Sequence, residues 1–391
     1  LTLELGGKSA FVVFEDADLD AAVEGLVDSI WFNQGEVCCA GSRLLVQAKV
    51  VDKLHAKIKK RIQKLRLGLP LDKSTDLGSL VSQTQYQRVD QMVQQGLQHG
   101  GELFQAYDGQ SDGNYYPPSL ITEIDSSHPL AQEEIFGPVL VSMTFRTQTE
   151  AVALANNSRY GLAASVWSEN INRAMDVAPK LKAGVIWINC HNQFDASCGF
   201  GGVRESGFGR EGGKEGLFEY LKPKSLTSTK KLKPVTIKQQ TSSDETIDRT
   251  LKFYIGGKQV RPDGGHSIAT YKADGSLASL VGSGNRKDIR NAVSAATKAN
   301  AWSTQNGHVR AQIIYFLAEN LALRESEWIK RLQDLCGITK KEAKTEFNAS
   351  LSRLFSYAAW SDKYDGAVHN APYRGVTMAL PEAIGVLAQI A

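Results

Sequence analysis

Short apolar runs alternate with segments of helical periodicity along the first half of the chain. Four runs have the length and composition of buried strands, at residues 1–4, 10–14, 44–46 and 139–143. A Gly-Gly pair separates the first two runs, which predicts a strand, a tight turn and a second strand.

Helical spacing of apolar side chains predicts the elements between these strands. The first helix is expected to follow Asp18 and to end at Gly35, and further helices are expected at residues 54–65, 150–156 and 170–182. Because strands alternate with helices, the pattern predicts an α/β fold with a parallel sheet.

The composition of the chain changes after residue 198. Residues 199–216 are rich in glycine, which predicts irregular or closely approached backbone, and residues 222–249 are polar and basic, as in a linker. From residue 250 onward, apolar residues recur at helical spacing in four segments, at 289–302, 309–324, 328–335 and 347–360. The predicted parts of the chain are therefore residues 1–221, 222–249 and 250–391.

Composition narrows the classes of function. A formal net charge of +3 is small for 391 residues, so no nucleic-acid partner is predicted. No run reaches the roughly 18 apolar residues of a membrane helix, so no membrane span is predicted. Five cysteines, with Cys38 and Cys39 adjacent, do not form a disulfide framework and indicate a reducing compartment such as the cytoplasm. The chain opens directly in strand-like sequence, so we expect it to begin inside a folded domain.

Cys38 is the first candidate for chemistry. It lies in a loop flanked by Gly35 and Gly41, and a helix is expected to follow it. A reactive thiolate needs access and a lowered pKa, and a loop at a helix N-terminus supplies both. The alternative is an inert buried thiol, the commoner role of an isolated cysteine. Adjacent cysteines are a poor zinc site and no other Cys or His pair has ligand spacing, so no metal is predicted.

Glu4 is the second candidate. It ends the first predicted strand, a position at which α/β proteins often carry functional carboxylates. The alternative is an exposed or capping glutamate without a catalytic role.

The combination of these two residues resembles the paired active-site signature of the NAD(P)-dependent aldehyde dehydrogenases. The first motif is Leu-Glu-Leu-Gly-Gly-Lys-Ser at residues 3–9, and the second surrounds Cys38, which lies 34 residues after Glu4. Further motifs follow in the family's order, at residues 133–138, 156–163, 187–189 and 200–211. The resemblance covers about the first 230 residues and implies the fold of that family's catalytic domain.

The resemblance also implies a mechanism. Cys38 would be the nucleophile that forms a hemithioacetal and then a thioester, and Glu4 the base that activates the hydrolytic water. The backbone N–H of Cys38 would supply half of an oxyanion hole.

By the same resemblance, four residues would contact a NAD or NADP cofactor. Glu134 and Gln85 match positions that contact the nicotinamide ribose, Phe136 matches a position beside the nicotinamide, and Leu5 would offer a backbone group to the carboxamide. The substrate would be a small-molecule aldehyde. Four apolar side chains match positions that line the substrate tunnel, with plain core packing as the alternative reading: Phe32, Val37, Phe194 and Phe200.

This sequence departs from the family pattern in the first unit. The family's cofactor-domain strands and phosphate-binding turn precede the Glu motif, so we expect this chain by itself to bind NAD poorly. Cys198 and Gly199 replace a pair of a small residue and proline at the tunnel mouth, which leaves the substrate open. Glu36 stands where the family usually has glutamine, and its charge is expected to disfavour a nearby thiolate.

After residue 250, the chain resembles the start of the same family a second time. The matching segments appear in order, at residues 253–258, 284–288, 357–360 and 381–390. Two tandem units resemble the two-domain family sixteen aldehyde dehydrogenases, here with a partial second aldehyde dehydrogenase-like unit. Residues 222–235 resemble a bridging strand that pairs subunits in this family, which makes a homodimer the expected assembly.

The leading hypothesis is therefore aldehyde oxidation with NAD(P) by the parent protein. The competing hypothesis is a non-catalytic scaffold that keeps the same fold and offers interaction surfaces. A third hypothesis is an esterase-type activity that uses Cys38 and Glu4 without a cofactor. Dependence on added NAD separates the first hypothesis from the third.

Overall fold

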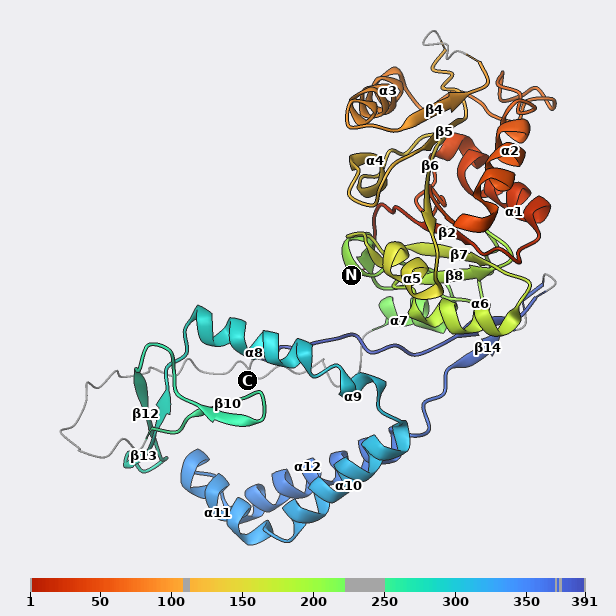
Figure 1. Ribbon diagram of the computed structural model, residues 1–391. Coiled ribbons are helices and arrows are strands. Elements are labelled where there is room, and N and C mark those ends of the chain that lie inside the picture. The colour runs from red at the N-terminus through yellow and green to blue at the C-terminus, as the bar shows by residue number, and fades with distance from the viewer. Residues whose placement is uncertain (1, 108–112, 222–249, 370, 373–374, 390–391) are drawn as a thin grey trace. The chain divides into compact units, whose positions relative to one another are not determined.

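The structure is a computed structural model of the chain. It describes residues 2–107, 113–221, 250–369, 371–372 and 375–389 (Figure 1). The predicted linker lies outside the described residues.

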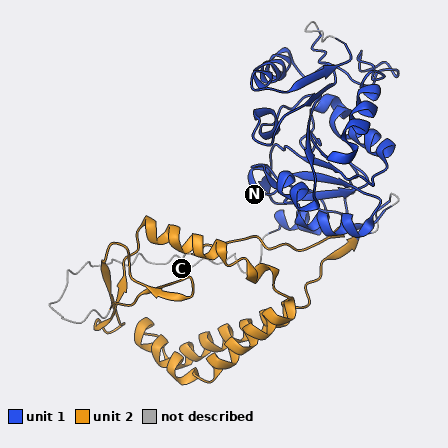
Figure 2. Cartoon of the chain, viewed as in Figure 1, with its two compact units in different colours: residues 1–227, 369–377 blue, residues 228–368, 378–391 orange. Residues whose placement is uncertain are grey.

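The chain divides into two compact units (Figure 2). The first comprises residues 1–227 with 369–377, and the second comprises residues 228–368 with 378–391. The first unit contains both candidate catalytic residues.

A seven-stranded sheet forms the centre of the first unit (Figure 1), with the order β4-β5-β6-β3-β2-β7-β8. Its strands are β2 (Ala10–Val13), β3 (Arg43–Gln47), β4 (Glu102–Gln105), β5 (Ser119–Thr122), β6 (Val139–Phe145), β7 (Ala163–Trp167) and β8 (Val185–Ile188). The β4–β5 pair is antiparallel and the other neighbours are parallel. The predicted α/β fold with a parallel sheet is confirmed.

Helices cover both faces of this sheet, which explains why its central strands are apolar on both sides. Phe11 of β2 packs in one cluster with Ile58 of α2, and the next residue, Val12, packs in another with Ala151 of α5. The helices of this unit are α1 (Leu19–Leu26), α2 (Val51–Ile62), α3 (Gln83–Leu97), α4 (Pro129–Gln132), α5 (Gln148–Asn156), α6 (Ile171–Val177) and α7 (Gly213–Glu219).

The predicted first helix ends earlier than its apolar spacing indicated. Asp18 caps α1 by accepting from the N–H groups of Asp20 and Ala21. The chain then continues as a π-helix, η1 (Val27–Trp31), and a tight turn, η2 (Phe32–Gly35). Shorter helical turns elsewhere are η3 (Ala48–Val50), η4 (Ala178–Lys180) and η5 (Arg204–Ser206).

The strand that carries Glu4 belongs to a separate ribbon. β1 (Leu3–Glu4) pairs antiparallel with β9 (Gly207–Phe208), and not with β2 across the Gly-Gly pair. Gly207 has a φ of 117°, and a Cβ there would lie 1.9 Å from the carbonyl oxygen of Leu3. The glycine-rich segment therefore approaches β1 as closely as backbone allows, as its composition predicted.

The helical spacing after residue 250 predicted the helices of the second unit, which also contains β-hairpins. Its hairpins are formed by β10 (Phe253–Ile255) with β11 (Lys258–Val260) and β12 (Ser267–Tyr271) with β13 (Leu277–Gly282). Its helices are α8 (Arg286–Lys298), α9 (Ala301–Thr304), α10 (Gly307–Ala322), α11 (Glu325–Cys336) and α12 (Lys340–Trp360). A further short pair is β14 (Ala367–His369) with β15 (Thr377–Ala379).

Candidate active site

Cys38 lies in a tight turn between η2 and β3. The N–H of Ala40 donates to the carbonyl oxygen of Val37 at 3.1 Å, and β3 begins at Arg43. The prediction of a helix after Cys38 is therefore wrong. The apolar run that follows is a strand between β2 and β6, and it begins too soon after the turn for a helix to form.

The environment of the turn lowers the pKa of Cys38 to about 7. The largest cause is a hydrogen bond from the Cys39 thiol, while partial burial and the negative charge of Glu4 raise the pKa. Cys39 itself is buried, and its thiol lies 3.5 Å from Oδ1 of Asn192. A hydrogen bond from Cys39 thus favours the thiolate form of Cys38.

Glu4 stands at the end of β1, opposite Gly207 of β9. Its side chain is exposed, and its charge is close enough to Cys38 to affect the pKa of that thiol. The structure therefore brings together the two residues that were predicted to be catalytic, one on the β1 ribbon and one beside the central sheet.

The two glycines after Glu4 and Leu5 connect the candidate base with Glu134. The N–H of Gly7 donates to Oε1 of Glu134 at 2.9 Å, and a Cβ on Gly6 would lie 2.2 Å from Oε2 of the same carboxylate. A Cβ on Gly7 would lie 2.5 Å from the carbonyl oxygen of Cys38. The absence of side chains at these glycines lets the Cys38 turn and Glu134 pack against the same short segment.

The remaining predicted cofactor residues surround the same place. Nε2 of Gln85 on α3 donates to the carbonyl oxygen of Phe136 at 2.8 Å, and Phe136 has a left-handed φ of 57°. The N–H of Leu5 donates to the carbonyl oxygen of Ser206 at 3.0 Å, so the group that Leu5 can offer to a ligand is its own carbonyl.

A small cavity of about 10 Å³, the space of about one water molecule, lies among these residues. Gly7, Val37, Glu134 and Phe136 are among the residues that line it. The residues fit the nicotinamide-ribose end of NAD or NADP, because Glu134 offers a carboxylate acceptor for hydroxyl groups and Gly6 leaves no side chain against it.

Aromatic side chains also pack near Cys38. Phe200 and Val37 pack in one cluster with Cys38 and Trp187. The ring of Phe194 lies 5.1 Å from that of Phe200 and 5.4 Å from that of Trp187, in edge-to-face contacts.

The predicted tunnel residues differ in exposure. Phe194 is 50% exposed and Phe32 is 60% exposed, whereas Val37 and Phe200 are partly buried. The exposure of Phe32 and Phe194 does not fit the alternative of plain core packing.

The carboxylate of Glu36 is engaged by a backbone group of the loop before α3. Both carboxylate oxygens accept from the N–H of Val81, at 3.2 and 3.1 Å. Burial raises the pKa of Glu36, and the hydrogen bond from Val81 lowers it. The negative charge of Glu4 raises the pKa of Cys38.

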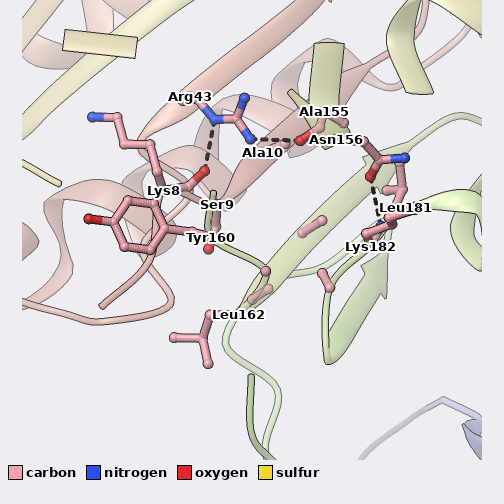
Figure 3. Close-up of a pocket in the computed structure, with 14 residues that line it drawn as sticks. Lys8, Ser9, Ala10, Arg43, Ala155, Asn156, Tyr160, Leu162, Leu181 and Lys182 are labelled. Carbon is pink, nitrogen blue, oxygen red and sulfur yellow. Dashed lines mark hydrogen bonds between the residues drawn. The ribbon is translucent and has the colours of Figure 1, made fainter. Parts of the chain in front are cut away.

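Lys8 and Arg43 are buried cations beside the site that the pattern of the chain did not predict (Figure 3). Arg43 donates to the carbonyl oxygens of Lys8 at 2.8 Å and Ala155 at 2.7 Å (Figure 3). It also donates to the carbonyl oxygen of Leu154 at 3.0 Å. Nζ of Lys8 is buried without a hydrogen-bond partner, and burial lowers its pKa to about 7. The sequence feature that could have identified both cations is their position at the start of a buried strand. Lys8 lies two residues before β2, and Arg43 is the first residue of β3.

His191 is a further residue that was not predicted, and it lies beside the backbone of Cys39. Its Nδ1 lies 2.5 Å from Oγ of Ser165, and its ring lies 4.4 Å from that of Trp187. Burial lowers the pKa of His191 to about 3, so the imidazole is neutral at physiological pH.

In the part of the chain that the structure describes, no group of three or more His, Cys, Asp or Glu side chains is arranged to hold a metal ion. No helix among the described residues has the length and apolar character needed to span a bilayer.

Comparison with known proteins agrees with this geometry. An aldehyde dehydrogenase of Emericella nidulans is 41% identical over 227 residues, which are 58% of this chain and 46% of that protein. The structure of betaine aldehyde dehydrogenase from Staphylococcus aureus in complex with NAD+ matches with a TM-score of 0.55 and 39% identity, over 56% of this chain and 44% of that one. An NAD-dependent aldehyde dehydrogenase from Sinorhizobium meliloti also matches with a TM-score of 0.55, at 40% identity and the same two coverages.

The chain spans about half the length of the curated relatives that it matches. A model of the aldehyde dehydrogenase family matches this chain over residues 1–226 and 262–391. The matched residues contain the Cys38 turn, the Glu4 ribbon and most of the second unit. By these matches and by the arrangement of its site, the chain belongs to the aldehyde dehydrogenase family.

Proposed function

We propose that the protein to which this chain belongs oxidises an aldehyde to a carboxylic acid with NAD or NADP, with Cys38 as nucleophile and Glu4 as general base. The observation that carries the proposal is the Cys38 thiol, which lies partly buried in its turn, next to Cys39 and within electrostatic range of the Glu4 carboxylate. The family match and the NAD-bound structural relative support the choice of cofactor.

The reaction uses two steps at Cys38. The thiolate forms a carbon–sulfur bond with the carbonyl carbon of the aldehyde, which gives a hemithioacetal. NAD or NADP, when bound, supplies the acceptor for the hydride that leaves this carbon. Glu4 takes a proton from water, whose oxygen attacks the thioester on Cys38 and releases the carboxylic acid and the thiolate. The backbone N–H of Cys38 stabilises the developing oxyanion.

The other predicted residues hold the reactants. Glu134 and Gln85 hold ribose hydroxyl groups, Phe136 packs beside the nicotinamide, and the carbonyl of Leu5 accepts from the carboxamide. Phe32, Val37, Phe194 and Phe200 line the path of a small-molecule aldehyde, supported by the edge-to-face contact between Phe194 and Phe200. A panel of a short aliphatic aldehyde and betaine aldehyde, the substrate named for one structural relative, would define the substrate class.

The test is NADH formation by the intact protein, compared with its Cys38→Ala variant. We expect activity that depends on added NAD and falls by about three orders of magnitude or more in the variant. No activity in either protein, with folding confirmed by thermal unfolding, would favour the non-catalytic scaffold. Ester hydrolysis without NAD as the sole activity would favour the third hypothesis.

We further propose the division of the chain into a first unit at residues 1–221, a bridging strand and linker at 222–249, and a partial second aldehyde dehydrogenase-like unit at 250–391, as in family sixteen. The family match over residues 262–391 and the hairpin formed by β10 and β11 support this tandem arrangement. Limited proteolysis of the intact protein should cut first between residues 222 and 249. Early cleavage inside β2 to β8 would contradict it.

A homodimer in a reducing compartment such as the cytoplasm completes the proposal. Its support is the resemblance of residues 222–235 to a bridging strand and the five free cysteines. Light scattering of the intact protein at neutral pH should give the mass of two chains, and a strictly monomeric protein would overturn this part.

A further inference from the structure

The segment before Cys38 has a strained backbone. Asn33, Gln34 and Gly35 follow one another with left-handed φ values of 46°, 57° and 73°. Glycine adopts this conformation freely, but asparagine does so at some cost and glutamine at a greater one. A Cβ on Gly35 would also lie 2.2 Å from the carbonyl oxygen of Gly137. Contacts from elsewhere in the fold must therefore hold this segment in place.

Two side chains of the segment provide such contacts, and both reach the loop before α3. Oε1 of Gln34 accepts from the N–H of Gly78 at 3.0 Å. Both carboxylate oxygens of Glu36 accept from the N–H of Val81, at 3.2 and 3.1 Å. Because each acceptor follows or belongs to the strained residues, the two bonds oppose relaxation of the segment toward ordinary φ values.

A third bond closes the segment on itself. Nδ2 of Asn33 donates to the backbone carbonyl oxygen of Glu36 at 3.1 Å, and the N–H of Glu36 donates to the carbonyl oxygen of Asn33 at 3.0 Å. The backbone of Glu36 is thus fixed to Asn33 while its carboxylate is fixed to Val81. Cys38 is only two residues further along the chain.

The loop at the other end of these bonds leads to the predicted cofactor residues. Ser82 caps α3, and Gln85 in the first turn of that helix donates to the carbonyl oxygen of Phe136 at 2.8 Å. Gly137, the next residue, packs against Gly35. The contacts therefore connect three segments to one another: the strained segment, the loop and first turn of α3, and residues 136–137.

We propose that Glu36 is a positioning residue for Cys38, which it presents in a reactive orientation by accepting the Val81 N–H and so holding the left-handed segment against the loop before α3. The proposal rests on the proposed role of Cys38 as the nucleophile. Glu36 itself touches neither the substrate nor the reacting atoms. The acceptor oxygen, and not the negative charge, is the functional feature.

The test compares Glu36→Ala and Glu36→Gln in the intact protein. Glutamine keeps an acceptor at the same length without the charge, whereas alanine removes the acceptor. Glu150→Ala is the matched control, because Glu150 accepts from the backbone N–H of Arg146 at 2.8 Å in an exposed cap of α5, remote from Cys38 along the chain. The readouts are the rate of Cys38 alkylation by iodoacetamide, located by mass spectrometry, and kcat with KM for NAD and for the aldehyde.

We expect Glu36→Ala to slow Cys38 alkylation and to lower kcat by about tenfold each, the effect of losing one hydrogen bond from a backbone N–H. KM should change much less than kcat, because a misplaced nucleophile affects the chemical step. Glu36→Gln should stay within about twofold of wild type and Glu150→Ala should not differ from it. Alkylation at the wild-type rate in Glu36→Ala, or an equal loss in Glu36→Gln, would overturn the proposal.

A second variant keeps the test decisive if Glu36→Ala does not fold. Glu36→Asp retains the charge but withdraws the acceptor from Val81 by one methylene, so it should also slow alkylation, and a wild-type rate would overturn the proposal. Failure of the proposed function is seen separately. In that case wild type forms no NADH, while the alkylation rates still decide the role of Glu36.

Discussion

The N–H of Gly7 donates a 2.9 Å hydrogen bond to Oε1 of Glu134, a residue 127 positions further along the chain. This bond joins the segment after the candidate base to the carboxylate that is proposed to hold the cofactor ribose. Because a Cβ on Gly7 would lie 2.5 Å from the carbonyl oxygen of Cys38, one residue without a side chain separates the Cys38 turn from Glu134.

Adding a methyl group to Gly6 or Gly7 should have different consequences. A Cβ on Gly7 meets the backbone of Cys38 at 2.5 Å, so Gly7→Ala should lower kcat at least about tenfold and lower the free energy of unfolding by about 1–3 kcal/mol. A Cβ on Gly6 meets the carboxylate of Glu134, which can swing away, so Gly6→Ala should chiefly raise KM for NAD. Steady-state kinetics and thermal unfolding check both.

Gly78→Ala is the control for these two variants, since its added Cβ approaches no atom more closely than 3.5 Å and its N–H is kept. Equal effects of Gly6→Ala and Gly7→Ala on kcat, KM and stability would contradict the assignment of the two contacts.

The pH profile of Cys38 should respond to its two neighbours in opposite directions. The midpoint of alkylation is expected near the Cys38 pKa of about 7. Glu4→Gln removes a charge that raises this pKa, so the midpoint should move down. Cys39→Ala removes the hydrogen bond that lowers it, so the midpoint should move up. Alkylation rates measured across the pH range check the prediction, and equal midpoints in all three proteins would refute it.

Replacing Lys8 should stabilise the protein at neutral pH. Burial, and then the charge of Arg43, lower the pKa of Lys8 to about 7 in the folded state, whereas an unfolded lysine titrates near pH 10.4. Between these values the unfolded state binds more protons, so stability should rise with pH across this window. Lys8→Met should remove that slope and raise the free energy of unfolding at pH 7 by about 1–4 kcal/mol.

Denaturant unfolding at neutral pH and at about pH 9 measures the effect of Lys8→Met. The control is Lys49→Met, because Lys49 is 74% exposed in an ion pair with Glu15 and should change stability little. A loss of stability in Lys8→Met at neutral pH would mean that Nζ has a partner in the folded protein.

Arg43→Met should have the opposite effect on stability. Arg43 is buried and satisfies three backbone carbonyl oxygens, which methionine would leave without a donor. We expect the free energy of unfolding to fall by about 3 kcal/mol or more. Chemical unfolding beside an Arg66→Ala control, whose side chain is 63% exposed, measures this difference. Equal stabilities of the two variants would rule out a stabilising contribution from the three hydrogen bonds of Arg43.

The three strands at the centre of the sheet were predictable because they are buried on both faces. Residues 10–14, 44–46 and 139–143 are apolar runs interrupted only by Ser142, and the structure contains β2, β3 and β6 there. The outer strands β4, β5, β7 and β8 were not predicted from this pattern. The α1 helix was predictable from its cap at Asp18. Its early end was not, because the apolar spacing continues through the π-helix without interruption.

The candidate site was predictable where chemistry and spacing coincide, and not where contacts are distant in the chain. Glu4 and Cys38 could be identified from their motifs. The pairing of β1 with β9 could not, because a strand of two residues carries no pattern that selects a partner. The hydrogen bond of Glu36 was also hidden, since the sequence shows its charge but not the direction of its side chain.

The centre of the sheet has a consequence for how the protein is made. Ala10 of β2 is paired with Ala164 of β7 on one side and with Arg43 of β3 on the other. On the ribosome, the Cys38 turn emerges long before β7 does, so the strand on one flank of β2 is absent for most of the synthesis of this unit. Pairings between such distant segments form late. The nascent chain therefore carries an unpaired edge of β2 until β7 is translated, and such an edge is a template for pairing with another chain.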